Sequence, residues 1–287
     1  MSGQTGQEAS RPIGVFDSGL GGLTVVSQIM RLMGGEDVIY LGDSARVPYG
    51  IKSPETIRRF ALQDMAFLLR FDPKMIVVAC NTASAVALDA LCAEAGGSTR
   101  VVGVVAAAAE AAVSLAGDRP IGVVGTEATI ASGAYQRAIR ELAPDTEVVA
   151  VAAPLLVPIV EEGRDQDDPI VLHVLADYLH DLQRARPAVL ILGCTHYPLL
   201  AEAFGKLMGP DTVLLNPGAT AAQRVQSYLH ETSLINGCAA GSLRCFSTDN
   251  PQRFTRLAGR FLGRSVHDVG WVGTDELAGA RHGAAEI

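Results

Sequence analysis

Lysine is scarce in this chain, which contains only Lys52, Lys74 and Lys206 among its 287 residues. The formal net charge is −8, and no stretch of the sequence gathers Lys and Arg into a basic cluster. Nucleic acids and anionic membrane surfaces are bound by such clusters, because Lys and Arg hold the phosphates. The composition therefore argues against both kinds of partner, and we expect neither a nucleic acid nor a membrane.

Long apolar runs are also missing. None approaches the ~20 consecutive residues with which a helix crosses a bilayer. The opening residues, MSGQTGQEASR, lack the apolar stretch of a signal peptide. We therefore expect a cytoplasmic protein in which residues 1–11 form a disordered tail.

Cysteine occurs five times, an odd number in a chain without an export signal. A disulfide framework is therefore not expected, and the side chains should be free thiols. No C-x-x-C pair exists, and the spacing of Cys80, Cys194 and His196 is not that of a common zinc site. Metal binding by these three residues with an acidic partner is a weaker alternative, and we expect no metal.

The chain instead alternates short β-branched runs with longer amphipathic stretches, a pattern typical of βα units around a parallel sheet. Its length is more typical of two modest domains than of one. The predicted strands cover residues 12–16, 37–41, 75–79, 100–105, 120–125, 146–152, 188–193 and 212–216. Helices are predicted over residues 54–70, 132–142 and 168–185, where apolar residues recur every three and four positions.

Near the C-terminus, DNPQRFTRLAGRFLG (249–263) predicts one more helix. Asp249 or Asn250 can cap it, Pro251 fits its first turn, and Gly263 can end it. Residues 265–287 are rich in Gly and Ala and show no clear periodicity, so we expect a loose tail there.

Two stretches have counterparts further along the chain. IGVFDSGLGGLTV (13–25) is similar to IGVVGTEATIASG (121–133), and MIVVACNTASA (75–85) is similar to VLILGCTHYPL (189–199). This repetition indicates two related α/β halves. Ligands of parallel α/β sheets bind at the carboxyl ends of strands, so each half offers one cysteine, Cys80 or Cys194, to a cleft between facing halves.

A thiol between a strand end and a helix start lies near backbone N–H groups and the positive end of a helix dipole, which favours its thiolate. Two such thiols can remove a proton from one face of a carbon atom and return a proton to the opposite face. Buried cysteines are more often inert small side chains, the role assigned to Cys92, Cys238 and Cys245. The similar polar residues that follow Cys80 (CNT) and Cys194 (CTH) favour a catalytic role for these two cysteines.

Asp17, Ser18 and Gly19 follow the first predicted strand and lead into GLGG. The glycines invite a dinucleotide-binding interpretation, but the G-x-G-x-x-G pattern fails at Thr24 and the lysine of a phosphate-binding loop is absent. A tight βα turn explains the glycines. It leaves the carboxylate of Asp17 to orient an ammonium group or to exchange a proton with a thiol.

Other polar groups follow the remaining predicted strands. YLGDSARVPYG (40–50) ends in a Pro-Tyr-Gly turn. This turn is either a plain loop or a loop whose backbone N–H groups bind a carboxylate. His196 lies two residues after Cys194, which favours proton transfer over a role in the core. Glu161 and Glu162, by pattern alone, are solvated charges at a helix end. Hydroxyl and amide donors for a small anion are supplied by Ser18, Asn81, Thr82, Thr126, Thr129 and Thr195.

Seven of these stretches, in this order over residues 12–264, resemble the cofactor-independent glutamate racemases of the aspartate/glutamate racemase superfamily. They are GVFDSGLGGLTV, YLGDSARVPYG, VVACNTASA, IGVVGTEATI, PLLVPIVEEG, LILGCTHYPLL and RLAGRFLG. The resemblance implies an α/β protein of two pseudo-symmetric Rossmann-like or flavodoxin-like domains with mainly parallel sheets, an active-site cleft between them, no cofactor, and a homodimer.

On this basis we expect a first domain of residues 12–103 with 217–264, and a second of residues 104–216. The chain departs from the family at GVVAAAAEAA (103–112), where relatives carry a proline and this sequence predicts a helix.

The resemblance also implies roles for single residues. Cys80 and Cys194 are the two catalytic acid–bases, which act on opposite enantiomers, and Asp17, His196 and Glu161 assist them. Glu162, next to Glu161, competes for the last role. The implied substrate contacts are Asp17, Ser18, Pro48, Tyr49, Gly50, Asn81, Thr82, Thr126, Thr195 and His196.

We therefore predict an enzyme that interconverts L- and D-glutamate by two-base proton transfer at Cα and supplies D-glutamate for peptidoglycan. No lysine lies in a site-like motif, so no aldimine chemistry is indicated. The alternatives are an aspartate racemase of the same superfamily and a non-catalytic protein that binds an acidic amino acid. The presence of both cysteines argues against the latter, whereas glutamate over aspartate rests on the resemblance.

Overall fold

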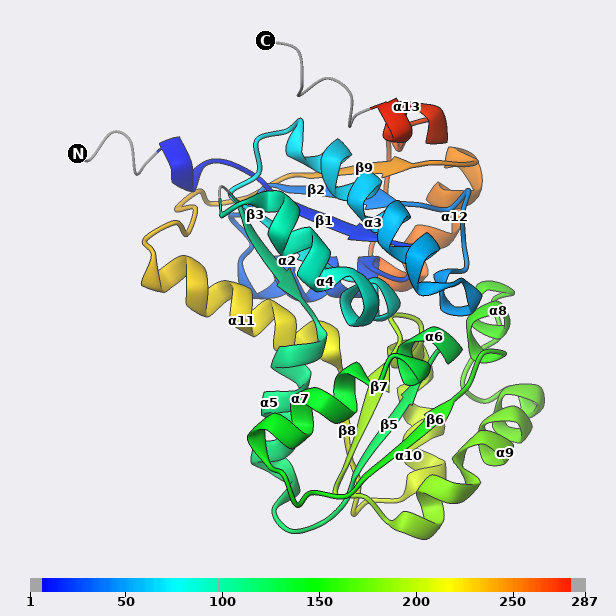
Figure 1. Ribbon diagram of the computed structural model, residues 1–287. Coiled ribbons are helices and arrows are strands. Elements are labelled where there is room, and N and C mark those ends of the chain that lie inside the picture. Colours follow the sequence, from blue (N-terminus) through cyan, green and yellow to red (C-terminus); the bar gives the residue numbers. More distant parts are fainter. Residues whose placement is uncertain (1–6, 98, 280–287) are drawn as a thin grey trace.

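The computed structural model describes residues 7–97 and 99–279, which form two α/β lobes, one above the other in Figure 1. The upper lobe is built on a six-stranded sheet of order β10-β9-β2-β1-β3-β4, and the lower lobe on a four-stranded sheet of order β6-β5-β7-β8. Neighbouring strands are parallel throughout. The predicted fold class, with two mainly parallel sheets, is confirmed.

All eight predicted strands are present, and two further strands, β9 and β10, were not predicted. The first sheet contains β1 (Ile13–Asp17), β2 (Val38–Gly42), β3 (Met75–Val78), β4 (Arg100–Gly103), β9 (Leu243–Ser247) and β10 (Gly270–Trp271). The second contains β5 (Ile121–Gly125), β6 (Val148–Ala152), β7 (Val189–Gly193) and β8 (Val213–Leu215). Continuous burial of strands such as β1, β3 and β7 fits parallel sheets that are covered on both faces.

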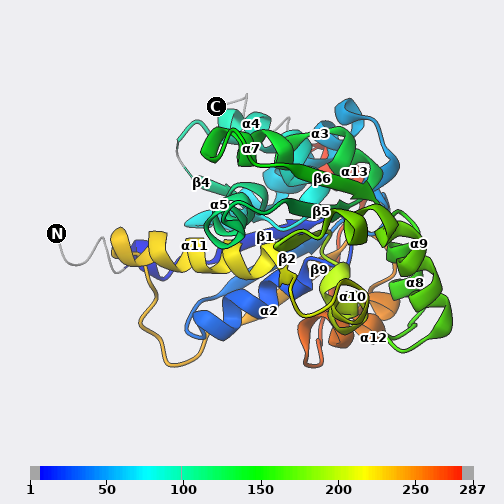
Figure 2. The ribbon, with the colours of Figure 1, turned by 90° about the horizontal axis from the view of Figure 1, so that it is seen from below.

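Helices cover the faces of both sheets, as the two perpendicular views show (Figures 1 and 2). The upper lobe carries α2 (Leu23–Leu32), the short 3₁₀-helix η1 (Tyr49–Ile51), α3 (Pro54–Leu69), α4 (Asn81–Ala95), α11 (Pro217–Glu231), α12 (Pro251–Leu262) and α13 (Thr274–Gly279). The lower lobe carries α5 (Val105–Ala116), α6 (Glu127–Ala131), α7 (Ala134–Leu142), α8 (Leu156–Glu161), α9 (Pro169–Ala185), the 3₁₀-helix η2 (Tyr197–Leu200) and α10 (Ala201–Met208).

Local sequence signals account for several helix ends. Ser53 and Asp168 cap α3 and α9 by accepting hydrogen bonds from Thr56 N and Ile170 N, and a proline follows each cap. Asn250, rather than Asp249, caps α12, and Gly263 ends it in the left-handed conformation, as the sequence predicted. The alanine-rich run forms α5, so the predicted helix there is confirmed.

The internal repetition of the sequence corresponds to a repeated strand order. In the upper lobe β1 lies between β2 and β3, with β4 beyond, and in the lower lobe β5 lies between β6 and β7, with β8 beyond. The order reverses beside β1 and beside β5, which are the switch points where open α/β sheets bind ligands. Cys80 follows β3 and Cys194 follows β7, so the two thiols occupy equivalent positions in the two lobes.

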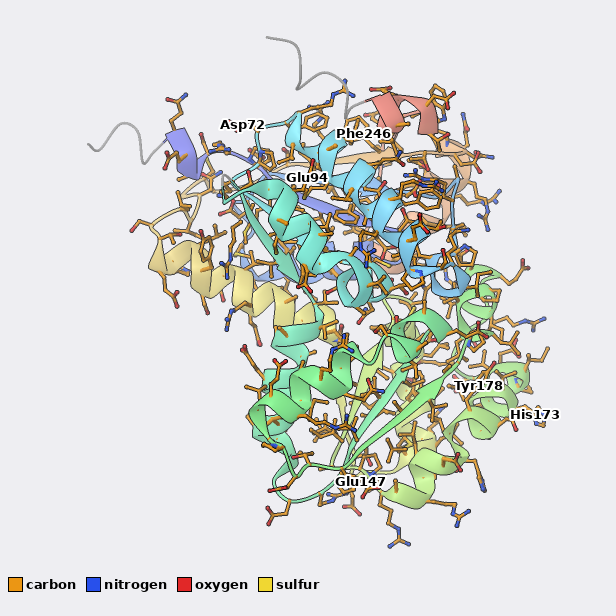
Figure 3. The ribbon with its side chains drawn as sticks, viewed as in Figure 1. Asp72, Glu94, Glu147, His173, Tyr178 and Phe246 are labelled. Atoms are coloured by element: carbon orange, nitrogen blue, oxygen red, sulfur yellow. The ribbon has the colours of Figure 1, made fainter. Side chains whose placement is uncertain are left out.

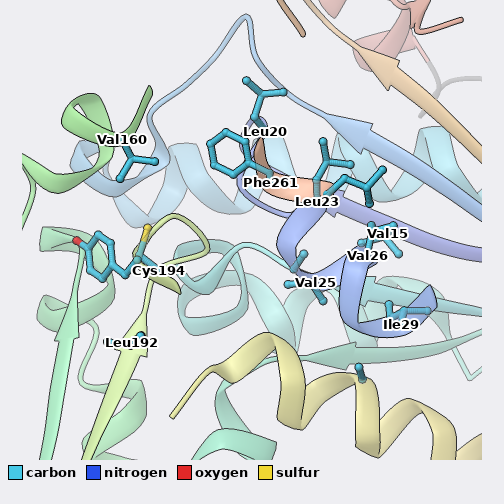
Figure 4. Close-up of a cluster of buried hydrophobic side chains, with 14 of the residues drawn as sticks. Val15, Leu20, Leu23, Val25, Val26, Ile29, Val160, Leu192, Cys194 and Phe261 are labelled. Atoms are coloured by element: carbon cyan, nitrogen blue, oxygen red, sulfur yellow. The ribbon is translucent and has the colours of Figure 1, made fainter. Parts of the chain in front are cut away.

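The main apolar core is continuous between the lobes. Its buried members include Val15 and Val77 of the first sheet together with Val124, Leu190 and Cys194 of the second lobe. Figure 4 shows the part of this cluster in which Leu20 and Phe261 of the upper lobe lie on the side that faces Val160 and Cys194. Burial of a shared core resists separation of the lobes.

Residues near both chain ends are more ordered than the sequence predicts. β10 adds to the sheet beside β9 and α13 packs on α3, so the prediction of a loose tail is wrong for residues 270–279. Residues 7–9 are helical, and Lys74 Nζ donates to Ala9 O at 2.7 Å, which corrects the prediction of disorder there. Residues 1–6 and 280–287 lie outside the described residues. The domain bounds at residues 103–104 and 216–217 stay a prediction.

Within the described part of the chain, no helix has both the length and the apolar character needed to cross a membrane.

Candidate active site

The carboxyl ends of the strands in the two lobes meet at the boundary between the lobes. Figure 3 marks the opposite ends: Asp72 and Glu94 lie at the far side of the upper lobe, and Glu147, just before β6, at the bottom of the lower lobe. The residues that end or follow β1, β3, β5 and β7 therefore come together between the sheets. They include Cys80, Cys194, Asp17 and Thr126, all predicted from the sequence.

Cys80 is the residue that precedes the first turn of α4. Its Sγ accepts a hydrogen bond from Ala83 N at 3.5 Å and lies 3.6 Å from Ser18 Oγ. Burial, and then the charge of Asp17, raise the pKa of this thiol to about 12, and the contacts from Ala83 and Ser18 oppose the rise. The free protein therefore holds Cys80 as a thiol at neutral pH.

Asp17 ends β1 and is fully buried. Its carboxylate accepts hydrogen bonds from Gly19 N at 3.0 Å and from Thr195 Oγ1 at 3.3 Å, and the second of these crosses between the lobes. Burial raises the pKa of Asp17, and the charge of His196 opposes that rise. Asp17 therefore raises the pKa of Cys80 through its charge and also contacts Thr195, the residue that follows Cys194.

Cys194, His196 and Glu161 form a chain of contacts on the lower lobe. Cys194 Sγ lies 3.9 Å from His196 Nδ1, and His196 Nε2 lies 3.2 Å from Glu161 Oε1. Burial lowers the pKa of His196, but its contacts with Cys194 and Glu161 outweigh burial and raise the pKa to about 10. His196 is therefore an imidazolium at neutral pH. Glu161 makes this contact, whereas the neighbouring Glu162 is exposed at the end of α8.

Helix α12 of the upper lobe contacts the Glu161 and His196 end of this series of contacts. Arg253 Nη2 lies 3.7 Å from Glu161 Oε2, and Arg260 Nη1 donates to Val160 O at 2.8 Å. The ring of Phe261 meets that of His196 edge-on, with centroids 5.2 Å apart. The sequence predicted α12 but not this role, because nothing in its amphipathic pattern shows what its arginines contact.

The glycines after β1 allow the lobes to approach each other. Neither Gly21 nor Gly22 has a positive φ. A Cβ at Gly21 would lie 2.1 Å from Thr195 Oγ1 and 2.6 Å from His196 Nδ1, and one at Gly22 would lie 2.5 Å from Asp17 Cβ. The predicted tight turn is present between β1 and α2, but at these two positions glycine is required for space rather than for backbone freedom.

Three threonine hydroxyls join the lobes on the Cys80 side. Thr82 Oγ1 of α4 lies 2.9 Å from Thr126 Oγ1 and 3.1 Å from Thr129 Oγ1, both at the start of α6. Beside them, Tyr135 donates to Asn81 Oδ1 at 2.6 Å. The backbone N–H groups of Asn81 and Thr82 lie in the first turn of α4 and have no acceptor within that helix. Tyr135 was not identified from the sequence, because an isolated helical tyrosine gives no signal.

The Pro-Tyr-Gly turn also reaches the lobe boundary. Pro48 is exposed, and the side chain of Tyr49 turns away to Asp43 and Asp64, so its hydroxyl is not free for a substrate. A Cβ at Gly50 would lie 2.6 Å from Thr126 Cβ, which requires a glycine. Within the described residues, the backbone N–H groups of Tyr49 and Gly50 donate no hydrogen bond.

Among residues 7–97 and 99–279, no three His, Cys, Asp or Glu side chains are arranged to hold a metal ion. His196 instead places one ring nitrogen against Cys194 and the other against Glu161. The arrangement can exchange protons at two sulfur atoms.

Comparisons with known proteins agree with this chemistry. Residues 13–225 match the family model described as Asp/Glu/Hydantoin racemase. A glutamate racemase of Geobacter metallireducens is 44% identical over 90% of this chain and 95% of its own. A second, from Thermus thermophilus, is 45% identical over 94% of this chain and 100% of its own.

Solved structures extend the comparison to the fold. The glutamate racemase of Francisella tularensis, in complex with D-glutamate, superimposes with a TM-score of 0.87 at 38% identity, over 93% of this chain and 99% of its own. The aspartate racemase of Picrophilus torridus reaches a TM-score of 0.54 at 16% identity, over 78% of this chain and 99% of its own, and so shares the fold alone.

Proposed function

The chain belongs to the Asp/Glu/Hydantoin racemase family, and within this family we propose that it is a glutamate racemase that interconverts L- and D-glutamate without a cofactor. The observation that carries this proposal is the equivalent placement of Cys80 and Cys194 at strand ends of two lobes with the same strand order. The relatives that match nearly the whole chain are glutamate racemases, which favours glutamate over aspartate.

Inversion at Cα needs a thiolate that removes the α-proton and a thiol that delivers a proton to the opposite face. For one enantiomer, Cys80 Sγ takes the proton and Cys194 Sγ gives one up, and for the other enantiomer the roles reverse. After one turnover the first sulfur carries the proton and the second is the thiolate. Before the next turnover in the same direction, His196, 3.9 Å from Cys194, can return a proton to that sulfur and regain one from solvent, while Cys80 releases its proton to solvent.

Substrate binding itself can activate Cys80. The pKa of this thiol is raised first by burial and then by the charge of Asp17. A substrate ammonium group beside Asp17 would offset that charge and so remove one of the two causes. The backbone N–H groups of Asn81, Thr82, Tyr49 and Gly50 would hold carboxylate groups, with Ser18, Thr126 and Thr195 as side-chain contacts and Pro48 shaping the turn.

Exchange of the Cα proton in D2O tests the function directly. We expect the wild type to incorporate deuterium at Cα and to racemise both enantiomers of glutamate, with little action on aspartate, as followed by NMR and polarimetry. Faster turnover of aspartate would replace the proposal by an aspartate racemase. Absence of exchange with either amino acid, in a folded protein that binds D-glutamate, would leave a binding protein.

Within this proposal, D-glutamate is supplied for peptidoglycan. Location in the cytoplasm, expected from the sequence composition, and assembly as a homodimer, which the family resemblance implies, stay predictions.

Glu161, rather than Glu162, should control the protonation of His196. The Glu161→Gln variant loses the anion that faces His196 Nε2, so we expect the imidazole to titrate below the wild-type value of about 10 and kcat/KM to fall about tenfold. Because the folded pKa of His196 is raised, the pair stabilises the protein fully below its ordinary pKa, and this contribution is lost as the pH rises through about 10.

Nitrogen-15 NMR of the imidazole measures the titration, and denaturant unfolding at several pH values measures the stability. Glu162→Gln is the matched control, because its side chain is exposed. Equal effects of the two variants would show that neither glutamate is specific for His196.

A further inference from the structure

The loop of residues 43–50 and helix α3 contribute a group of four side chains that proton transfer at Cα does not use: Asp43, Tyr49 and Asp64, which are buried, and Arg46, which is half-buried. Both carboxylates are 0% exposed and Tyr49 is 1% exposed. Asp43 directly follows β2, and its backbone N–H donates to Asp17 O at 3.0 Å. The group is therefore attached to the strand end that carries the candidate active site.

Hydrogen bonds join each of the two carboxyl groups to both Arg46 and Tyr49. Arg46 Nε donates to Asp43 Oδ2 at 2.7 Å, and Arg46 Nη2 donates to Asp64 Oδ1 at 2.9 Å. Thr248 Oγ1 donates to the second oxygen of Asp43 at 2.9 Å. Tyr49 Oη lies 2.5 Å from Asp43 Oδ2 and 2.9 Å from Asp64 Oδ2.

These contacts determine how many protons Tyr49 and the two carboxyl groups hold together. A phenol carries one O–H proton, so Tyr49 can donate to one carboxylate and not to both. The remaining contact is a hydrogen bond only if the other carboxyl is protonated and donates to Tyr49 Oη. Asp43 has the shorter contact and further donors in Arg46 and Thr248, so it is the ionised member. The extra proton belongs on Asp64.

The electrostatics of Asp64 agree with this count. Burial and the charge of Asp43 raise its pKa well above the ordinary value, against the opposing effect of Arg46. The charged or titratable groups that act on it are Asp43, Arg46 and Tyr49. Where α13 packs on α3, Arg70 pairs with Glu276 at the surface instead.

We infer that Asp43, Arg46, Asp64 and the Tyr49 hydroxyl form a positioning network, held by one proton on Asp64, which fixes the backbone N–H groups of Tyr49 and Gly50 for a substrate carboxylate. On its other side the turn packs against Thr126, where a Cβ at Gly50 would not fit. The carboxylate role rests on the proposed function, whereas the proton count does not. The four side chains act on the substrate through the backbone of the turn.

The same substitution at the two carboxylates tests the network. In Asp64→Asn the amide replaces the protonated carboxyl as donor to Tyr49 and its oxygen still accepts from Arg46, so we expect KM for glutamate within about twofold of the wild type. Asp43→Asn removes the anion beside the half-buried guanidinium of Arg46, and Tyr49→Phe removes the hydroxyl that bridges the two carboxyl groups. Each should raise KM about tenfold or more and change kcat less, because the lost interaction is one of binding.

Unfolding measured against pH tests the proton count without any substrate. The unfolded wild type releases the Asp64 proton at an ordinary carboxyl pKa and the folded protein holds it, so this contribution to stability is lost as the pH rises through the folded pKa. Asn has no such proton to release. The stability of Asp64→Asn should therefore increase relative to that of the wild type as the pH rises above the ordinary carboxyl range.

The outcomes separate the two parts of the inference. A pH-independent stability difference for Asp64→Asn would overturn the proton count. Unchanged KM in both Asp43→Asn and Tyr49→Phe would overturn the positioning role, and Tyr49→Phe alone decides it if Asp43→Asn does not fold. A wild type that does not turn over glutamate would refute the proposed function, while the unfolding measurements would still test the shared proton.

Discussion

Replacement of Cys80 or Cys194 by alanine is expected to lower the rate of racemisation by about 10³-fold or more, because each sulfur is one of two obligatory proton carriers. Both side chains are buried, at 5% and 6% exposure, and small, so the loss of packing should leave the fold intact. Circular dichroism and thermal unfolding check the fold, and polarimetry with each enantiomer measures the rate. Cys92→Ala, at an exposed cysteine, is the matched control.

The same variants distinguish two bases from one. If Cys80 and Cys194 face opposite sides of Cα, a variant with one remaining thiol can exchange the α-proton of one enantiomer without inverting it. Cys80→Ala and Cys194→Ala should then exchange opposite enantiomers in D2O. Racemisation that survives in either variant, or exchange of the same enantiomer by both, would contradict the two-thiol mechanism.

The two half-sites are not chemically equivalent, although the strand order around them is. Cys194 has a histidine partner that is positively charged at neutral pH, and Cys80 has a hydroxyl, a backbone N–H and the nearby carboxylate of Asp17. Because the equilibrium constant for racemisation is one, kcat/KM must stay equal in the two directions. The asymmetry can therefore appear only in kcat and KM taken separately.

The sequence was sufficient to predict β1 to β8, since each is a short β-branched run in a parallel sheet. The strand β9 was missed because its five residues include Arg244 and Ser247 and give no clear alternation. Pairing with the open edge of β2 makes it a strand. The same holds for β10, whose two residues carry no periodicity of their own.

The placement of candidate site residues was predictable where a motif accompanies a strand end, as with Cys80, Cys194 and Asp17, whereas their roles stay predictions. What no local pattern contains is the direction in which a side chain points. Tyr49 was expected at the substrate, but it joins Asp43 and Asp64, the second of which lies fifteen residues further along the chain. The choice between Glu161 and Glu162 likewise depends on the orientation of the last turn of α8.

Gly21→Ala is expected to lower kcat/KM by about 100-fold while the protein stays folded. The added Cβ would lie 2.1 Å from Thr195 Oγ1 and 2.6 Å from His196 Nδ1, and neither atom can move without cost to the site. Rotation of Thr195 breaks its hydrogen bond to Asp17, and the imidazole of His196 is held by Cys194, Glu161 and the ring of Phe261. Misplacement of catalytic groups by about 1 Å can cost that factor in rate.

Matched glycine variants separate this effect from simple destabilisation. Gly34→Ala meets nothing nearer than Met30 O at 3.5 Å and should be nearly neutral. Gly22→Ala drives a Cβ to 2.5 Å from Asp17 Cβ within the upper lobe, so it should lower the unfolding temperature as well as activity. If Gly21→Ala lowers activity with an unfolding temperature close to that of Gly34→Ala, the glycine serves the approach of the two lobes. Wild-type activity in Gly21→Ala would mean that turnover does not require this approach.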